Sequence, residues 1–125
     1  MIKTSYFLRR KPGMSLEDFQ KYWLESHGPL VQKHAATIGM VRYIQVHARP
    51  PASPRPDPLR GEMLEPFDGV AEFWIDPAKA TGTDEERREV GRILAEDEAN
   101  FIDFSRSTMT RGEEHYMVGV PTPLS

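Results

Sequence analysis

One amphipathic helix, expected over residues 15–38, restricts most strongly how this chain of 125 residues can fold. At 100° per residue, its large apolar side chains and two histidines fall within an arc of roughly 80°, whereas the charged side chains point away. Ser15 is a good N-cap residue, and Asp18 three positions later makes a near capping box. One face of this helix must therefore be buried against a second layer. The residues of this face are Leu16, Phe19, Trp23, His27, Leu30 and His34.

A proline interrupts this helix beside His27. Pro29 has no N–H to donate to the carbonyl of Glu25, and it disfavours helical geometry at Gly28. We therefore expect a kink next to His27, with a free backbone carbonyl close to an imidazole on the buried face. His27 is then either a core histidine bonded to that carbonyl or a group available for chemistry.

The composition predicts one domain over residues 1–125 and excludes several classes of function. The net charge is −3 with both signs well mixed, so no basic surface for nucleic acid is expected. No apolar run approaches the length of a membrane span and no signal peptide is recognisable, which predicts a cytoplasmic protein without a membrane partner. The chain has no cysteine, which excludes disulfides, thiolate catalysis, iron–sulfur clusters and cysteine-type zinc sites.

The remaining elements follow from their periodicity and turn residues. Asp76 and Pro77 begin a short turn, and Thr83 with Glu86 forms a capping box for a second long helix. Its inner positions are Val90, Ile93, Leu94, Asp97 and Phe101. Residues 105–112 are expected to form a polar turn. The strands are expected at residues 2–9, 41–49, 69–75 and 113–120.

Residues 50–68 form a proline-rich loop, with five prolines between positions 50 and 58. Ordinary connections are shorter, so this loop is predicted to be either a functional lid or a mobile segment. The prolines favour an extended chain. Its apolar anchors are expected to be Leu59, Met63, Leu64 and Phe67.

The order β-α-β-β-α-β predicts an α+β fold, a ferredoxin-like antiparallel sheet with both helices on one face. Two helices can cover only that face. The strands at 41–49 and 69–75 nevertheless have large side chains on both faces, unlike a half-solvated sheet. We expect Tyr43, Val70 and Trp74 on the uncovered face and, as a consequence, a homodimer that pairs sheet against sheet.

Four segments together resemble the EthD-domain proteins of the dimeric α+β barrel superfamily: FQKYWLESHGPLV, YIQVH, DGVAEFWI and EDEANFIDFS. The resemblance extends over residues 2–120. Its most specific part is YW shortly before HGPL, combined with the downstream Y-x-Q-x-H strand. The chain departs from the family in the long proline-rich insertion after His47.

The resemblance implies a homodimer with the dimeric α+β barrel fold and a cavity in each protomer. It also implies small-molecule chemistry without an organic cofactor or metal ion. Reactions of the family's better-understood members are aldol cyclisation or dehydration of polyketides, decarboxylation of aromatic acids and lactone isomerisation. It matches His27 to the histidine of the HGPL motif, the best candidate for a general acid–base. The fold and family do not by themselves determine the reaction.

The candidate catalytic residues are His27, Tyr43 and His47. An unperturbed imidazole has a pKa near 6.5, so His27 can take and return a proton at neutral pH. Tyr43, Gln45 and His47 alternate along one strand face about 7 Å apart, where they could bind a polar ligand or an enolate oxygen. The alternative is that this face is a wet sheet edge.

The candidate substrate-binding residues are Trp23, Gln45, Glu72 and Trp74. Glu72 lies between Val70 and Trp74 on its strand face, so it is either an acid–base group with a raised pKa or the partner of a nearby arginine. The two tryptophans fit an apolar wall for an aromatic ring and fit a core equally well. No H-x-x-x-H or H-E-x-x-H spacing indicates a metal site.

The leading hypothesis is a cofactor-free lyase, cyclase or isomerase that acts on a small oxygenated aromatic or polyketide-like compound. One alternative is a non-catalytic protein that binds a small hydrophobic or aromatic molecule for a partner oxygenase. Another is a haem- or metal-dependent oxygenase. The first two differ in whether His27 has a proton-transfer partner, such as Tyr43 or His47, within hydrogen-bond reach.

Overall fold

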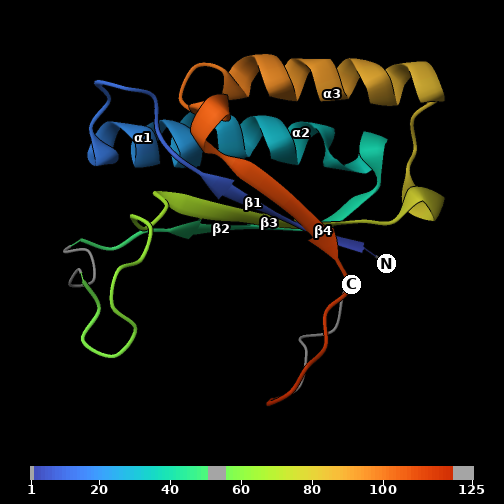
Figure 1. Ribbon diagram of the computed structural model, residues 1–125. Helices are drawn as coiled ribbons and strands as arrows, with labels where there is room; N and C mark the ends of the chain where they lie inside the picture. The colour runs from blue at the N-terminus through green and yellow to red at the C-terminus, as the bar shows by residue number, and fades with distance from the viewer. Residues whose placement is uncertain (1, 51–55, 120–125) are drawn as a thin grey trace.

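A four-stranded antiparallel sheet forms one layer of the computed structural model, and the helices form a second layer on one of its faces (Figure 1). The structure describes residues 2–50 and 56–119. The order of elements is the predicted one, with the first helix divided in two. The main elements are β1 (Ile2–Leu8), α1 (Leu16–Tyr22), α2 (Gly28–Ile38), β2 (Met40–His47), β3 (Gly69–Ile75), α3 (Asp84–Glu98) and β4 (Thr108–Gly112).

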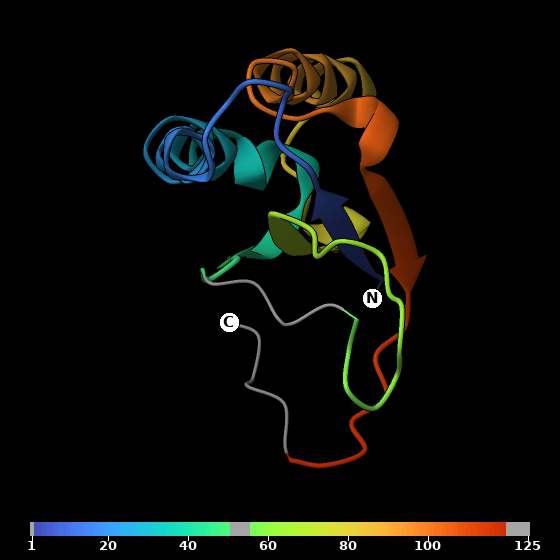
Figure 2. The ribbon, with the colours of Figure 1, turned by 60° about the vertical axis from the view of Figure 1, so that its left-hand side comes forward.

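The strand order is β2-β3-β1-β4, so the two strands that follow helices form the edges of the sheet. In both ribbon views, α1, α2 and α3 lie on the same side of this sheet (Figures 1 and 2). This is the ferredoxin-like α+β arrangement, and the predicted fold class is confirmed.

The helix ends are determined by the residues that the sequence indicates. The Ser15 hydroxyl accepts a hydrogen bond from the backbone N–H of Asp18, and Thr83 and Glu86 form a reciprocal capping box. Gly39 ends α2 with φ of 75°, a left-handed conformation that costs a residue without a β-carbon little.

A π-helical turn, η1 (Trp23–His27), separates α1 from α2. The N–H of Gly28 bonds to the carbonyl of Trp23, five residues back, and Pro29, the second residue of α2, has no N–H of its own. The predicted irregularity beside His27 is therefore confirmed. It takes the form of one extra residue in the turn, and such π-turns recur at functional sites.

Large aromatic side chains fill the space between the sheet and the helices. The four largest fully buried side chains are Trp23, Phe19, Phe101 and Leu8. Phe19 contacts both Trp23 and Phe101, with ring centroids 5.6 and 5.5 Å apart, so the core links α1 to the segment after α3. None of the helices in residues 2–50 and 56–119 is long and apolar enough to cross a membrane.

The inner face of the sheet, defined here as the face toward the helices, includes the row Tyr43, Gln45 and His47, as their spacing predicts. Tyr43 pairs with Phe73, and both pack on the helix-side core. The prediction that Tyr43 lies on the uncovered face is therefore wrong. Successive side chains of a strand point to opposite faces of the sheet. Tyr43 shares the inner face with Gln45, so it cannot also lie on the outer face with Val70.

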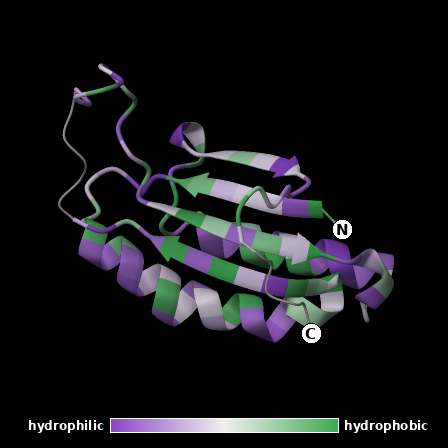
Figure 3. Ribbon diagram, turned by 90° about the horizontal axis from the view of Figure 1, so that it is seen from below, coloured by the Kyte–Doolittle hydropathy of each residue, from purple (hydrophilic) through white to green (hydrophobic). Residues whose placement is uncertain are grey.

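Hydrophobic and hydrophilic residues are interspersed along the strands in the view from below the sheet (Figure 3). The outer face, away from the helices, has apolar side chains such as Val46 and Val70 beside charged ones such as Glu72. Ile44 and Val46 are 39% and 46% exposed there, and Val46 pairs with Val70. Trp74 is on this face but is only 6% exposed, so the prediction of an exposed Trp74 is wrong. Side chains from both neighbouring strands and from residues beyond β4 cover its ring; these are Lys3, Arg42 and Glu114.

The last strand lies earlier in the chain than predicted. β4 occupies Thr108–Gly112, where a polar turn was expected, and residues 113–119 beyond it are exposed. A 3₁₀ turn, η3 (Phe104–Arg106), directly precedes β4, which pairs with the edge of β1 that does not pair with β3. Every residue of β4 is exposed, so pairing with β1 rather than an apolar pattern determines its position.

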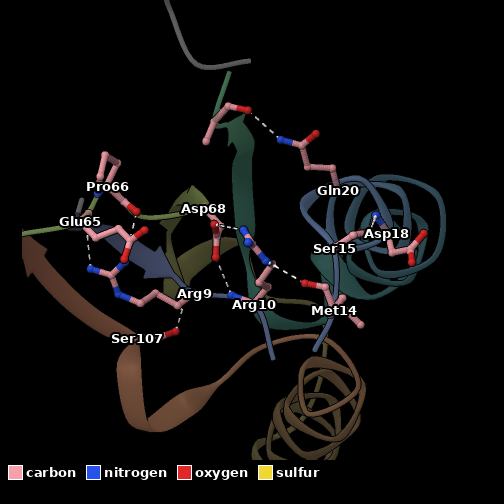
Figure 4. A network of polar contacts seen from close by, with 11 residues as sticks. Arg9, Arg10, Met14, Ser15, Asp18, Gln20, Glu65, Pro66, Asp68 and Ser107 are labelled. Carbon is pink, nitrogen blue, oxygen red and sulfur yellow. Dashed lines mark hydrogen bonds and ion pairs between the residues drawn. The ribbon is translucent and has the colours of Figure 1, made fainter. Parts of the chain in front are cut away.

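Two arginines at the end of β1 hold the later part of the proline-rich loop (Figure 4). Arg9 donates to the carbonyls of Glu65 and Pro66 at 2.8 and 3.1 Å, and its guanidinium lies over the Phe67 ring. Arg10 forms a 2.6 Å ion pair with Asp68. Of the four predicted apolar anchors only Phe67 is partly buried, because the others extend into solvent; these are Leu59, Met63 and Leu64.

Candidate active site

His27 is almost fully buried, with 5% exposure, and its Nδ1 lies 2.7 Å from Oδ2 of Asp97. The π-turn places the imidazole on the inner face of the helix, against the Phe101 ring at a centroid distance of 5.1 Å. Within the described ranges, Nε2 makes no hydrogen bond. The expected partner was Tyr43 or His47; the structure supplies Asp97 instead.

The Asp97 carboxylate is held by three side chains. Oδ1 accepts a 2.6 Å hydrogen bond from the Tyr22 hydroxyl and a longer one of 3.4 Å from Asn100, while Oδ2 accepts from His27. Burial tends to raise the pKa of Asp97, but these hydrogen bonds and the nearby imidazole lower it below its ordinary value. Asp97 is therefore an ionised acceptor at neutral pH.

Because an ionised carboxylate can only accept, the proton of neutral His27 is on Nδ1 and the lone pair is on Nε2. Burial lowers the pKa of His27 below 6.5, although the hydrogen bond and charge of Asp97 oppose that shift. The imidazole is therefore mostly neutral at pH 7. Its Nε2 is available as a general base in a fixed orientation.

A cavity of about 120 Å³ lies between His27 and the sheet. Most of its wall is apolar, and four polar side chains also line it: Tyr6, His27, Tyr43 and Glu98. An apolar cavity of similar size, roughly 150 Å³, holds a benzene molecule in another protein. This cavity therefore suits one small ring with a few polar substituents.

Tyr6 and Glu98 are the two polar residues of this cavity that the sequence pattern did not indicate, and Glu98 is the more unusual of the two. Burial raises its pKa from 4.5 to about 7, the negative charge of Asp97 adds to that rise, and a hydrogen bond with Tyr6 opposes it. The local signal was available, because Glu98 comes one helical turn after Leu94, a buried residue that the pattern identified as an inner position.

The row Tyr43, Gln45 and His47 is hydrogen-bonded from end to end. Gln45 Nε2 donates to the Tyr43 hydroxyl at 2.8 Å, and Gln45 Oε1 lies 2.8 Å from Nε2 of His47. Gln45 also donates at 3.0 Å to the Trp23 carbonyl, the same group that accepts the Gly28 N–H in the π-turn. A β-carbon at Gly28 would lie 3.2 Å from Gln45 Nε2, so glycine leaves room for this contact.

This row lines a second, more open pocket of about 370 Å³ between β2 and the start of α2. Tyr43 lines both spaces and so forms part of the partition between them. The His47 ring stacks on Trp23 at a centroid distance of 4.4 Å, and burial lowers the pKa of His47. Of the predicted residues, Trp23, His27 and Tyr43 meet at the cavity, while Gln45 and His47 line the open pocket.

Glu72 and Trp74 are not brought together with His27, because both lie on the outer face of the sheet. Glu72 pairs with Lys3 at 3.4 Å rather than with an arginine. The Trp74 indole donates to Glu114. In residues 2–50 and 56–119, no three histidine, aspartate or glutamate side chains gather as metal ligands would.

The fold and this site define a class, a ferredoxin-like α+β protein with a carboxylate-bound histidine beside a small cavity. The sequence model of the EthD domain matches residues 11–105, and the chain belongs to the EthD domain family.

Two known proteins are similar to this chain, one in sequence and one in fold. The conidial pigment biosynthesis dehydratase EthD of Metarhizium robertsii is 32% identical over 107 residues, which are 82% of this chain and 75% of that protein. The crystal structure of an ethyl tert-butyl ether D (EthD) family protein from Bacillus halodurans matches with a TM-score of 0.53, over 92% of this chain and 99% of that one. At 23% identity, this second match concerns the fold.

Proposed function

We propose that the protein is a cofactor-independent lyase, cyclase or isomerase that acts on a small oxygenated aromatic or polyketide-like compound. The observation that carries this proposal is the 2.7 Å contact from Asp97 to Nδ1 of His27, which directs the basic Nε2 away from Asp97 in a residue that lines a small cavity. A neutral, oriented imidazole in a mostly apolar space is suited to proton abstraction from carbon.

His27 Nε2 takes a proton from a carbon next to a carbonyl, and the substrate becomes an enolate. The Tyr43 hydroxyl accepts from Gln45, so its own proton is available to donate to the enolate oxygen. Trp23 supplies an aromatic wall, and Gln45 positions Tyr43. His47, in the open pocket, contacts the part of a larger substrate that extends past Tyr43.

Dehydration is the member of this reaction class that the Metarhizium relative favours. The Metarhizium protein is named a dehydratase of pigment biosynthesis, and it shares 32% identity over most of this chain. Loss of water from a β-hydroxy ketone begins with the same proton abstraction that His27 is placed to perform. The product is an enone, whose ultraviolet absorption can be followed directly.

The catalytic test compares wild type with His27→Asn on a panel of aryl and alkyl β-hydroxy ketones. The asparagine amide can replace Nδ1–H as the donor to Asp97, so folding should be retained. Turnover should fall by on the order of 10² to 10⁴. A variant that turns over like wild type per folded molecule, but melts at a lower temperature, contradicts the proposal and identifies a structural histidine.

The competing role is storage or delivery of a small aromatic molecule, and binding without turnover would favour it. Trp23 lines the cavity whereas Trp74 lies on the outer face, so Trp74→Phe isolates the reporting fluorophore. Phenol should quench the remaining fluorescence. Quenching by phenol together with no turnover of any panel compound would identify a binding protein.

We also propose that a second copy of the chain covers the outer face of the sheet. Ile44 and Val46 are 39% and 46% exposed beside Val70, and the helices cover only the opposite face. In a two-fold symmetric dimer, this apolar strip along β2 and β3 would pack against the same strip of the second copy. Light scattering at micromolar concentration should therefore give the mass of a homodimer.

A further inference from the structure

We propose that Glu98 is a second catalytic residue of this site, a general acid that protonates the leaving hydroxyl group while His27 takes the carbon-bound proton. This inference rests on the proposed function, because it assigns a second role within the same cavity. It adds a group that neither the sequence pattern nor the family resemblance singled out.

Two neighbouring carboxyl groups, those of Asp97 and Glu98, point to different places in the structure. Asp97 and Glu98 are consecutive at the end of α3, and side chains on consecutive helical residues point about 100° apart. Asp97 is thereby directed to Nδ1 of His27, outside the reacting space, and Glu98 lines the cavity that His27 also lines. Glu98 is thus within the same small volume of about 120 Å³ as the base.

The surroundings of Glu98 favour its protonated form. The titratable groups that face it are Tyr6 from β1, Tyr43 from β2, His27 from η1 and its neighbour Asp97. β3 and β4 contribute only apolar side chains to the same wall, namely Ala71, Phe73 and Met109. No cation among these groups stabilises the carboxylate while His27 is neutral, so burial raises the pKa of Glu98 to about 7.

His27 and Glu98 therefore have the pKa order that elimination requires. Burial lowers the pKa of the imidazole below 6.5 and raises that of the carboxyl to about 7. Between pH 6.5 and pH 7, most of the imidazole is therefore free base while most of the carboxyl still carries its proton. Two groups whose environments shift their pKa values in opposite directions can serve as the base and the acid of one reaction.

The dehydration of a β-hydroxy ketone by these two residues balances in protons and electrons. His27 Nε2 removes the α-proton to leave the enolate, whose electron pair then forms the new double bond as the C–O bond breaks. Glu98 gives its proton to the departing oxygen, which leaves as water. The imidazolium and the carboxylate that result are restored by one proton transfer from His27 to Glu98 through water, and no oxidant or reductant is needed.

The first experiment is independent of turnover. Carbon-13 NMR of protein labelled at glutamate side-chain carboxyls should show one resonance titrating near pH 7, and Glu98→Gln should remove it. Phenol in the cavity displaces water, so it should move this midpoint to higher pH. A Glu98 midpoint near the ordinary 4.5, or one that phenol leaves unchanged, overturns the proposal.

The second experiment measures kcat/KM against pH with a β-hydroxy ketone that the wild type dehydrates. Wild type should give a bell-shaped profile, with an acid limb from His27 and an alkaline limb from Glu98. Glu98→Gln should lower kcat by on the order of 10² to 10⁴ and remove the alkaline limb. Tyr6→Phe should shift that limb to higher pH, because the lost hydrogen bond had lowered the pKa of Glu98.

Glu96→Gln is the matched control, since the same chemical change is made on the exposed side of α3, where Glu96 pairs with Arg92. It should leave both limbs and kcat unchanged. If Glu98→Gln keeps the alkaline limb while His27→Asn loses turnover, Glu98 is not the acid and the proposed function stands. If wild type dehydrates none of the panel, the proposed function fails and the acid role fails with it.

Discussion

Nδ1 of His27 and Oδ2 of Asp97 lie 2.7 Å apart although the two residues are 70 positions apart in the chain. This contact joins the π-turn after α1 to the end of α3. It fixes the tautomer and the direction of the imidazole, in the way that a carboxylate orients the histidine of a hydrolase triad. The contact therefore depends on the docking of one helix on another, and the base role proposed for His27 depends on the contact.

Asp97→Asn should change both the tautomer and the pKa of His27. The asparagine amide can offer an N–H where Asp97 offered an acceptor, which favours the wrong tautomer of His27. We expect kcat to fall by about 10² to 10⁴ with little change in KM, and the pKa of His27 to fall further because the carboxylate had raised it. Nitrogen-15 NMR of the imidazole reads the tautomer directly. Asp18→Asn, at the exposed start of α1, is the control.

Glu98 should make the protein less stable as the pH rises from 5 to 8. Its pKa is about 7 in the folded state against an ordinary 4.5, so the folded state binds the proton more tightly than the unfolded state does. The stability that this bound proton gives is lost as the pH rises through this range. Glu98→Gln should remove that loss. Its stability relative to wild type should rise by roughly 2 kcal/mol between pH 5 and pH 8, measured by urea unfolding. A difference that is constant with pH would contradict the shifted pKa.

His27 acts in the opposite direction over part of this range. Its folded-state pKa is below 6.5, so the unfolded state takes up a proton first and stability falls as the pH drops below 6.5. The comparison of Glu98→Gln with wild type cancels this contribution, because His27 is present in both proteins.

Arg10 should be the main anchor of the proline-rich loop. Its guanidinium pairs with Asp68 and also donates to the Met14 carbonyl at 2.8 Å, so Arg10→Ala removes both contacts and leaves the loop held by Arg9 and Phe67. We expect a loss of about 1–2 kcal/mol and faster proteolysis within residues 56–66. Arg60→Ala, at an exposed ion pair within the loop, should change neither. Equal cleavage rates in wild type and Arg10→Ala would contradict the anchoring role.

Local signals in the sequence were sufficient for the elements that are themselves local. The Ser15 and Thr83 caps, the Gly39 stop and the irregularity caused by Pro29 each depend on residues within one or two helical turns. The partner of His27 was not predictable in this way. Asp97 was recognisable as an inner residue of its helix, but only the docking of α3 on the π-turn shows which group it meets.

The errors on the sheet have the same origin. β4 is an exposed edge strand, so its position depends on pairing with β1 and not on its own polar sequence TMTRG. The burial of Trp74 depends on Lys3, Arg42 and Glu114, which come from three separate parts of the chain. Glu98 could have been found, because a carboxyl one turn after a buried leucine is already an exception to the helical pattern.

Ile44→Lys should separate the two copies of the proposed dimer without unfolding either. Ile44 lies on the outer face, midway along the edge strand β2, and pairs in register with Glu72, so a lysine there can reach a carboxylate in the free protomer. In the dimer the same ammonium would be buried against the partner sheet, which should weaken association by on the order of 10² or more. Light scattering should then give a monomer mass, with a circular dichroism spectrum like that of wild type. Leu59→Lys, on the loop at 89% exposure, should remain dimeric. Dimers that persist in Ile44→Lys would place the interface elsewhere, and a monomeric wild type at micromolar concentration would refute the dimer itself.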